Sequence, residues 1–217
     1  MTSEMEALYP FLYAGKSEPD AVLAEVRRST EEKAAEIVAL RESLAESHAE
    51  RLVRCARELA ARFLDGGRLF AFGNGGSSSD AQRVVGLHAC PPPPARPLPA
   101  MSLPHDVASV TALSNDVGFE VVFARKLAAL GRRGDIAVGF STSGGSANLL
   151  RAFEEAGRLG MVTVGFAGYD GGKMAESGMV EHLFVVPSSS VHRIQEAQTT
   201  LYHVLWELTQ RALAGEL

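Results

Sequence analysis

The chain alternates short apolar runs with segments of helical periodicity from Arg68 onward, and this alternation restricts its fold more than any other feature. Each run is apolar over most of its length and short enough to be a buried strand. Strands separated by helices form a parallel sheet with helices on both faces. We therefore expect an α/β protein, a three-layer α-β-α sandwich around a five-stranded parallel sheet, with strands at residues 68–72, 98–103, 135–140, 161–166 and 182–186.

Two helical patterns precede the first strand. They cover about residues 19–44 and 48–64, and the second ends at a Gly-rich stop. We expect residues 1–66 to form an N-terminal helical segment that packs on the main domain, 67–217, and takes part in contacts between subunits. Core packing alone would also explain its apolar stripe. Residues 9–13 form an apolar patch that is expected to dock on another surface.

Charge and composition argue against several classes of protein. The net charge of −5 over 217 residues does not favour a nucleic-acid surface. No apolar stretch reaches the roughly 18 residues of a membrane span. The acidic N-terminus lacks the features of an export signal, so we expect a cytoplasmic protein with reduced cysteines, Cys55 and Cys90. His48 and His182 are expected at the surface.

The third predicted strand runs into a turn of small hydroxyl residues and then into a helix. The turn, from Gly139 to Ser146, reads Gly-Phe-Ser-Thr-Ser-Gly-Gly-Ser. The start of a helix has unpaired N–H groups and a dipole that favours an anion. Four hydroxyls in six residues are more than one helix cap needs. The turn predicts a phosphate site, and the alternative is an ordinary strand-to-helix turn capped by serine.

The first predicted strand also ends in a glycine-rich turn, which begins at Gly73 and reads Gly-Asn-Gly-Gly-Ser. Glycine lets the backbone approach a ligand closely and adopt positive φ. The turn is neither a Walker A loop nor a dinucleotide fingerprint, because the Lys of the first and the spacing of the second are missing. Ligands of parallel sheets bind at the carboxyl ends of the strands, so we expect both turns to face one crevice.

Five motifs that occur in one order resemble those of the sugar isomerase (SIS) domain and, within it, the phosphoheptose isomerase family. The likeness begins near residue 20 and continues to the C-terminus. It implies that residues 67–217 form a flavodoxin-like SIS domain, and that the protein is a homotetramer with sites at subunit interfaces. The motifs are the glycine-rich turn, Ser114-Asn115-Asp116 with Gly118, the hydroxyl turn, Asp170-Gly171-Gly172-Lys173-Met174 and Arg193-Ile194-Gln195-Glu196.

The resemblance also implies which residues form the site. Residues from two loops would contact the sugar, the hydroxyl turn would hold the phosphate, and the last helix would face the reacting end of the sugar from a neighbouring subunit. The sugar contacts are Asn74, Gly75, Gly76, Ser77, Asn115 and Asp116; the phosphate contacts are Ser141, Thr142, Ser143 and Ser146; and Gln195 and His203 are the candidate catalytic residues.

The chain departs from the family at its metal site. Where the isomerases carry a metal-binding His and, four residues later, a catalytic Glu, this sequence has Arg83 and Leu87. Arginine has no free acceptor and leucine has no proton to transfer. Gln195 and His203 alone are two ligands short of the usual zinc site, so no metal and no other cofactor is predicted. Arg83 and the neighbouring His88 are candidate pocket residues.

Two functions follow from these features. The first is an aldose–ketose isomerase of a seven-carbon or similar sugar phosphate, such as sedoheptulose 7-phosphate. It needs a base, for which His203 is the candidate, although a lone His on an apolar helix is commonly structural. Arg83 would replace the positive charge of the metal. The alternative is a non-catalytic SIS scaffold or regulator that resembles the bacterial DnaA initiator-associating protein.

Overall fold

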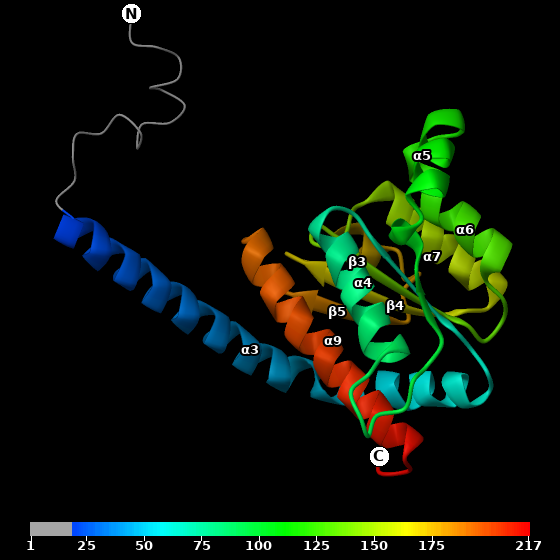
Figure 1. Ribbon diagram of the computed structural model, residues 1–217, viewed down its shortest axis with the longest axis horizontal. Helices are drawn as coiled ribbons and strands as arrows, with labels where there is room; N and C mark the ends of the chain where they lie inside the picture. The colour runs from blue at the N-terminus through cyan, green and yellow to red at the C-terminus, as the bar shows by residue number, and fades with distance from the viewer. Residues whose placement is uncertain (1–18) are drawn as a thin grey trace, which may run out of the picture. The chain divides into compact units, whose positions relative to one another are not determined.

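The computed structural model describes residues 19–217, of which Arg41–Leu217 form one compact unit and the preceding residues belong to another. Within the compact unit, five strands form an all-parallel sheet in the order β2-β1-β3-β4-β5 (Figure 1). The prediction of a five-stranded parallel sheet is confirmed. The predicted docking patch, residues 9–13, lies outside the described residues. The strands are β1 (Leu69–Gly73), β2 (Ala100–Ser102), β3 (Ile136–Ser141), β4 (Val162–Gly168) and β5 (His182–Val186).

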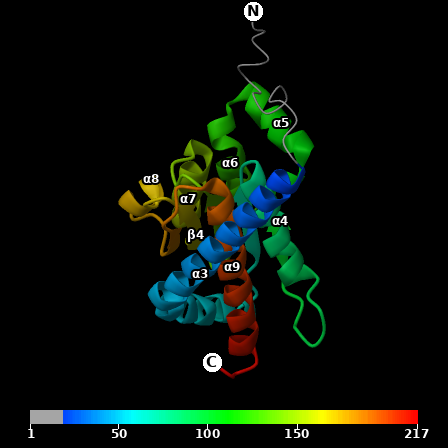
Figure 2. The ribbon, with the colours of Figure 1, turned by 90° about the vertical axis from the view of Figure 1, so that its left-hand side faces the viewer.

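Helices cover both faces of this sheet, which confirms the three-layer sandwich. On one face α4 (Gly76–Ala89) lies beside α9 (Val191–Leu213), as Figures 1 and 2 show. On the other face α6 (Val122–Leu130) packs on α7 (Ala147–Leu159). No helix within residues 19–217 is long and apolar enough to cross a membrane. The remaining short helices are α5 (Val107–Asp116), α8 (Gly172–Glu176) and the 3-10 turns Leu103–His105 and Phe119–Val121.

The two predicted N-terminal helices are a single helix. α3 runs without a break from Pro19 to Leu64. The prediction of a break was wrong because residues 45–47, Ala-Glu-Ser, contain no Gly or Pro to end a helix. From Arg41 onward α3 belongs to the compact unit, where it buries Leu44, Leu52, Leu59 and Phe63.

A row of aromatic side chains fixes α9 on the sheet. Phe140, Phe166 and Phe184 are register partners on β3, β4 and β5, and their ring centroids are 4.8 and 5.2 Å apart. Tyr202 of α9 meets the first two rings edge-on, at 5.7 and 6.4 Å. Such pairs favour a fixed geometry. The row therefore determines where α9 presents its other residues, including Gln195.

The open edge of β5 is covered by side chains of α3. Nε2 of His48 lies 2.9 Å from the carbonyl oxygen of Val185, and Arg51 donates to the carbonyl of Leu183. Nε2 of His182 lies 2.8 Å from the Glu58 carboxylate. The prediction that His48 and His182 lie at the surface was wrong: His48 is buried and His182 is half-buried, because both connect α3 to β5.

Candidate active site

The two glycine- and serine-rich turns leave the sheet at the same edge. β1 and β3 are neighbours, and Gly73 at the end of β1 is the register partner of Phe140. Gly75 has a φ of 53°, a left-handed conformation that favours glycine, and α4 begins immediately after it. The adjacency of the two strands brings the turns together at the edge where parallel sheets bind ligands.

Gln195 of α9 lies against the glycine-rich turn. A Cβ atom added to Gly76 would be 2.3 Å from Nε2 of Gln195, a distance that real Cβ atoms essentially never show. Only glycine at position 76 therefore lets the Gln195 carboxamide come this close. The structure thus brings together two residues that the sequence predicted for one site.

Three hydroxyl groups converge in the turn after β3. The hydroxyl of Ser141, which is buried, lies 3.2 Å from that of Ser146 and 3.5 Å from that of Ser143. Ser146 directly precedes α7, but its side chain does not cap that helix. The geometry therefore differs from an ordinary serine-capped turn. Hydroxyl donors grouped at the N-terminus of a helix can bind an anion such as phosphate.

An amide pair joins the two turns. Nδ2 of Asn74 donates to Oδ1 of Asn148, and Nδ2 of Asn148 donates to Oδ1 of Asn74, both at 2.9 Å. Asn148 lies in the first turn of α7 and is 2% exposed. Sequence reasoning missed Asn148, although an Asn two residues after a hydroxyl turn and within an apolar helix was a usable signal.

A second group of polar residues lies between α4 and α9. The Tyr202 hydroxyl donates to Oδ1 of Asp80 at 3.4 Å. Burial raises the pKa of the Asp80 carboxyl, and the bond from Tyr202 and the charge of Arg83 oppose this in part. Burial also raises the pKa of the Tyr202 hydroxyl, and the exposed Arg83 opposes this in part. Arg83 is therefore directed toward α9. The sequence did not predict Asp80 or Tyr202 as residues of this group.

The other predicted site residues lie at different distances from the turns. His203 is half-buried on α9, and its ring centroid is 5.3 Å from that of Tyr202. Asn115 and Asp116 are exposed at the end of α5, where Nδ2 of the first donates to the carboxylate of the second at 2.7 Å. Within residues 19–217 neither side chain hydrogen-bonds to the two turns.

His88 lies in the last turn of α4, at the opposite end of that helix from the glycine-rich turn. Its Nδ1 donates to the carbonyl of Val84 at 2.8 Å, and its ring packs on Phe63 of α3 at 5.7 Å. Burial lowers the pKa of the imidazole to about 4. The structure therefore places His88 in the packing between α4 and α3 and does not bring it to the turns.

The side chains of this site do not fit the zinc ion of the family. Arg83 and Leu87 stand where the sequence resemblance implies a metal-binding His and Glu, and neither can coordinate a cation. In the part of the chain that the structure describes, no group of three or more His, Cys, Asp or Glu side chains is placed to hold a metal. Gln195 and His203 remain as two potential ligands, which is fewer than zinc requires.

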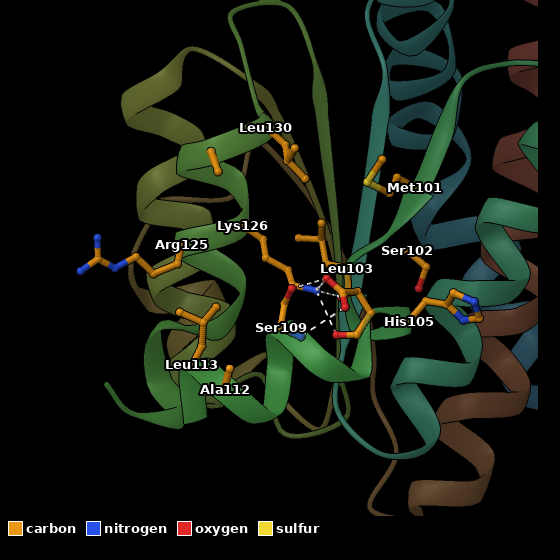
Figure 3. Close-up of a pocket in the computed structure, with 12 residues that line it drawn as sticks. Met101, Ser102, Leu103, His105, Ser109, Ala112, Leu113, Arg125, Lys126 and Leu130 are labelled. Carbon is orange, nitrogen blue, oxygen red and sulfur yellow. Dashed lines mark hydrogen bonds and ion pairs between the residues drawn. The ribbon is translucent and has the colours of Figure 1, made fainter. Parts of the chain in front are cut away.

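A cavity of about 650 Å³ lies elsewhere, between β2, α5 and α6 (Figure 3). Its walls are mainly apolar, and its buried cation, Lys126, donates to the carbonyl of Leu103 at 2.8 Å and to the Asp106 carboxylate at 3.3 Å. None of the predicted site residues lines this cavity. The residues predicted for the site therefore lie outside this cavity.

The sequence matches the family described as "SIS domain" over residues 34–168. It is 43% identical over 166 residues to the phosphoheptose isomerase of Aquifex aeolicus, covering 76% of this chain and 86% of that protein. It is 42% identical over 172 residues to the phosphoheptose isomerase of Roseiflexus sp., covering 79% and 86%.

The fold is similar to that of solved phosphoheptose isomerases. The structure from Neisseria gonorrhoeae superposes with a TM-score of 0.78 and 33% identity, covering 84% of this chain and 97% of that one. The structure from Francisella tularensis gives a TM-score of 0.78 and 30% identity, covering 88% and 98%. The similarity thus extends over almost the whole length of both enzymes.

Proposed function

The chain belongs to the SIS-domain family and, within it, to the phosphoheptose isomerases, and on this premise we propose that it isomerises a seven-carbon sugar phosphate such as sedoheptulose 7-phosphate. The observation that carries the proposal is the group of Ser141, Ser143 and Ser146 hydroxyls at the N-terminus of α7, beside the glycine-rich turn. An anion bound there would be held by hydroxyls and by the helix N-terminus.

We assign the two turns different parts of the substrate. The phosphate binds the hydroxyl turn, with Thr142 as its fourth hydroxyl, and the sugar binds along Asn74, Gly75, Gly76 and Ser77. Asn115 and Asp116, which are exposed at the end of α5, are also assigned to the sugar. Gln195, which lies against Gly76, would contact the reacting end of the sugar.

The chemistry is proposed to proceed without a metal. Aldose–ketose isomerisation moves a proton between adjacent carbons through an enediol and requires a base. His203, half-buried on α9, is the proposed base. Arg83 lies on α4 and is directed toward Tyr202, the neighbour of His203 on α9. Its positive charge would stabilise the negative charge of the enediolate.

We further propose a cytoplasmic homotetramer with sites at subunit interfaces and no nucleic-acid partner. An apolar groove of about 250 Å³ between the C-terminal part of α3 and α9 offers a surface for subunit contact. The net charge of −5 disfavours binding to nucleic acid. Light scattering of the purified chain tests the assembly: a monomer at micromolar concentration would contradict it.

Turnover of sedoheptulose 7-phosphate, compared with unphosphorylated sedoheptulose, tests the function. We expect turnover only of the phosphate ester. Ser143→Ala should raise KM about tenfold, because one hydrogen bond to a charged group is lost. The control is Ser47→Ala: the Ser47 hydroxyl donates to the carbonyl of Ser43 in its own helix, and its removal should leave KM unchanged. His203→Ala should abolish turnover and retain binding.

One observation favours a second function, a non-catalytic scaffold or regulator that binds a phosphosugar or a protein. Arg83 and Leu87 stand where the family carries the metal-binding His and the catalytic Glu. If the wild-type protein binds sedoheptulose 7-phosphate tightly without converting it, the scaffold or sensor replaces the isomerase as the proposed function.

A further inference from the structure

The two turns of the proposed site are joined by the carboxamides of Asn74 and Asn148. Each Nδ2 donates to the Oδ1 of the other residue at 2.9 Å. Asn74 belongs to the turn after β1, and Asn148 to the first turn of α7, just after the hydroxyl turn. Among the described residues, the side chain of Asn148 has no other hydrogen-bond partner. The pair therefore links the turn assigned to the sugar with the turn assigned to the phosphate.

The two carboxamides are buried to different extents, and this determines which of them can bind a ligand. A carboxamide offers two N–H donors and two acceptor lone pairs, and the pair uses one of each on Asn74. Asn148 is 2% exposed, whereas Asn74 is half-buried. The second N–H and the second lone pair of the Asn74 carboxamide thus remain for a ligand. The Asn148 carboxamide is too deeply buried for a ligand to contact it.

An apolar residue would be the simpler choice at position 148. The position is buried in a helix, where a carboxamide costs free energy unless it is paired and where Leu or Ala has the better helix propensity. The N-cap residue of α7 is Ser146, so helix capping does not explain why residue 148 is an Asn. What the Asn148 carboxamide does, and an apolar side chain could not do, is hold the Asn74 carboxamide in one orientation by two hydrogen bonds.

We propose that Asn148 is a positioning residue: it orients the Asn74 carboxamide toward the sugar and couples the sugar-binding turn to the phosphate-binding turn. The inference rests on the proposed function. It predicts that Asn148 acts on the substrate through Asn74 and not through the phosphate.

Binding measured by calorimetry tests this prediction. Asn148→Ala should weaken the binding of sedoheptulose 7-phosphate about tenfold, because the orienting bonds are lost, and that of inorganic phosphate less than about twofold. In an Asn74→Ala background, Asn148→Ala should have almost no further effect, because residues that act through one contact are not additive. Additive losses, or an equal loss for inorganic phosphate, would overturn the proposal.

Two further variants separate positioning from folding. Asn148→Asp keeps the size of the side chain and can still accept from Asn74, but its carboxylate cannot donate; we expect an intermediate loss of sugar-phosphate affinity. Gln210→Ala is the matched control, since its carboxamide also makes two hydrogen bonds, to the backbone of Arg96. It should leave both affinities unchanged, and a loss equal to that of Asn148→Ala would count against the proposal.

Hydrogen exchange without ligand distinguishes the failure of this inference from that of the proposed function. Asn148→Ala should accelerate amide exchange in residues 74–77, whereas Gln210→Ala should not. If the wild type binds no sugar phosphate, the proposed function fails, and the exchange result still decides whether Asn148 holds the turn. Unchanged exchange in Asn148→Ala would overturn the coupling.

Discussion

At the scale of the residue, Gly76 is the point at which the glycine-rich turn and α9 meet. Adding a Cβ there would place it 2.3 Å from Nε2 of Gln195, so the flexible end of Gln195 must move. We expect Gly76→Ala to lower kcat/KM at least about tenfold, because small displacements of site residues are costly for catalysis. Steady-state kinetics checks this. Gly86→Ala, in the open part of the same helix, should keep wild-type kinetics and add about 0.5–1 kcal/mol of stability.

His88 makes the stability of the protein depend on pH. Its folded pKa of about 4 lies below the ordinary value of 6.5, so between these values only the unfolded chain binds the proton. The contribution of His88 to the free energy of unfolding therefore rises with pH over this window, by about 3 kcal/mol. Urea denaturation from pH 4 to pH 7 should show this rise, and His88→Leu should reduce it by that amount.

The exposed His192 provides the control for this measurement. His192→Leu should keep the pH profile of the wild type, because the exposed His192 takes no part in the packing of His88 on Phe63. A profile that is equally steep in His88→Leu would show that other groups carry the pH dependence.

The residues that the sequence predicted are those that a local pattern marks. Glycines before a helix and hydroxyls after a strand have a meaning that needs only their neighbours in the chain. Asp80, Asn148 and Tyr202 have partners 74 to 122 positions away, so a local pattern could mark Asn148 as unusual but could not show what any of the three contacts. His48 and His182 were misplaced for the same reason, since their partners lie across the contact between α3 and β5.

At the scale of the element, α3 protects the edge of the sheet. Arg51 donates to the carbonyl of Leu183 on β5, a strand whose outer edge would otherwise be open to pairing with another chain. We expect Arg51→Ala to lower the free energy of unfolding by about 1 kcal/mol and to increase aggregation on heating. Arg54→Ala removes only an exposed ion pair of the same helix and should change stability by less than about 0.5 kcal/mol in urea. Equal effects of the two variants would contradict edge protection.

The elements themselves were largely predictable, and their ends were not. The strands β1, β3 and β4 are apolar runs that are buried along their whole length, as strands inside a parallel sheet are, whereas the edge strand β2 has three residues and is partly exposed. α3 was divided in the prediction because its apolar spacing weakens near residue 45. Backbone hydrogen bonds continue through a polar stretch as long as no Gly or Pro interrupts them, so the helix is continuous.

At the scale of the whole molecule, this chain combines the fold of the phosphoheptose isomerases with two side chains, Arg83 and Leu87, that differ from the metal-binding His and Glu that the sequence resemblance implies. The sheet has the fold of solved phosphoheptose isomerases, and Gln195 of α9 lies against the glycine-rich turn. Arg83 and Leu87 nevertheless replace two metal ligands within that arrangement. The sequence alone could identify this conflict, because it needed only the residue types at two positions of one helix.

A metal-free site predicts that turnover is insensitive to chelators. After dialysis against EDTA, the wild-type protein should keep its kcat and should contain far less than one zinc ion per subunit by atomic absorption, because too few ligands remain. Arg83→Ala should then lower kcat more than it raises KM, since the guanidinium is proposed to act on charge that develops only in the enediolate. The matched control is Arg54→Ala on the surface of α3, which should leave both constants unchanged. Loss of activity in EDTA that zinc restores would show that a metal binds through ligands of another kind, and would remove the role given to Arg83.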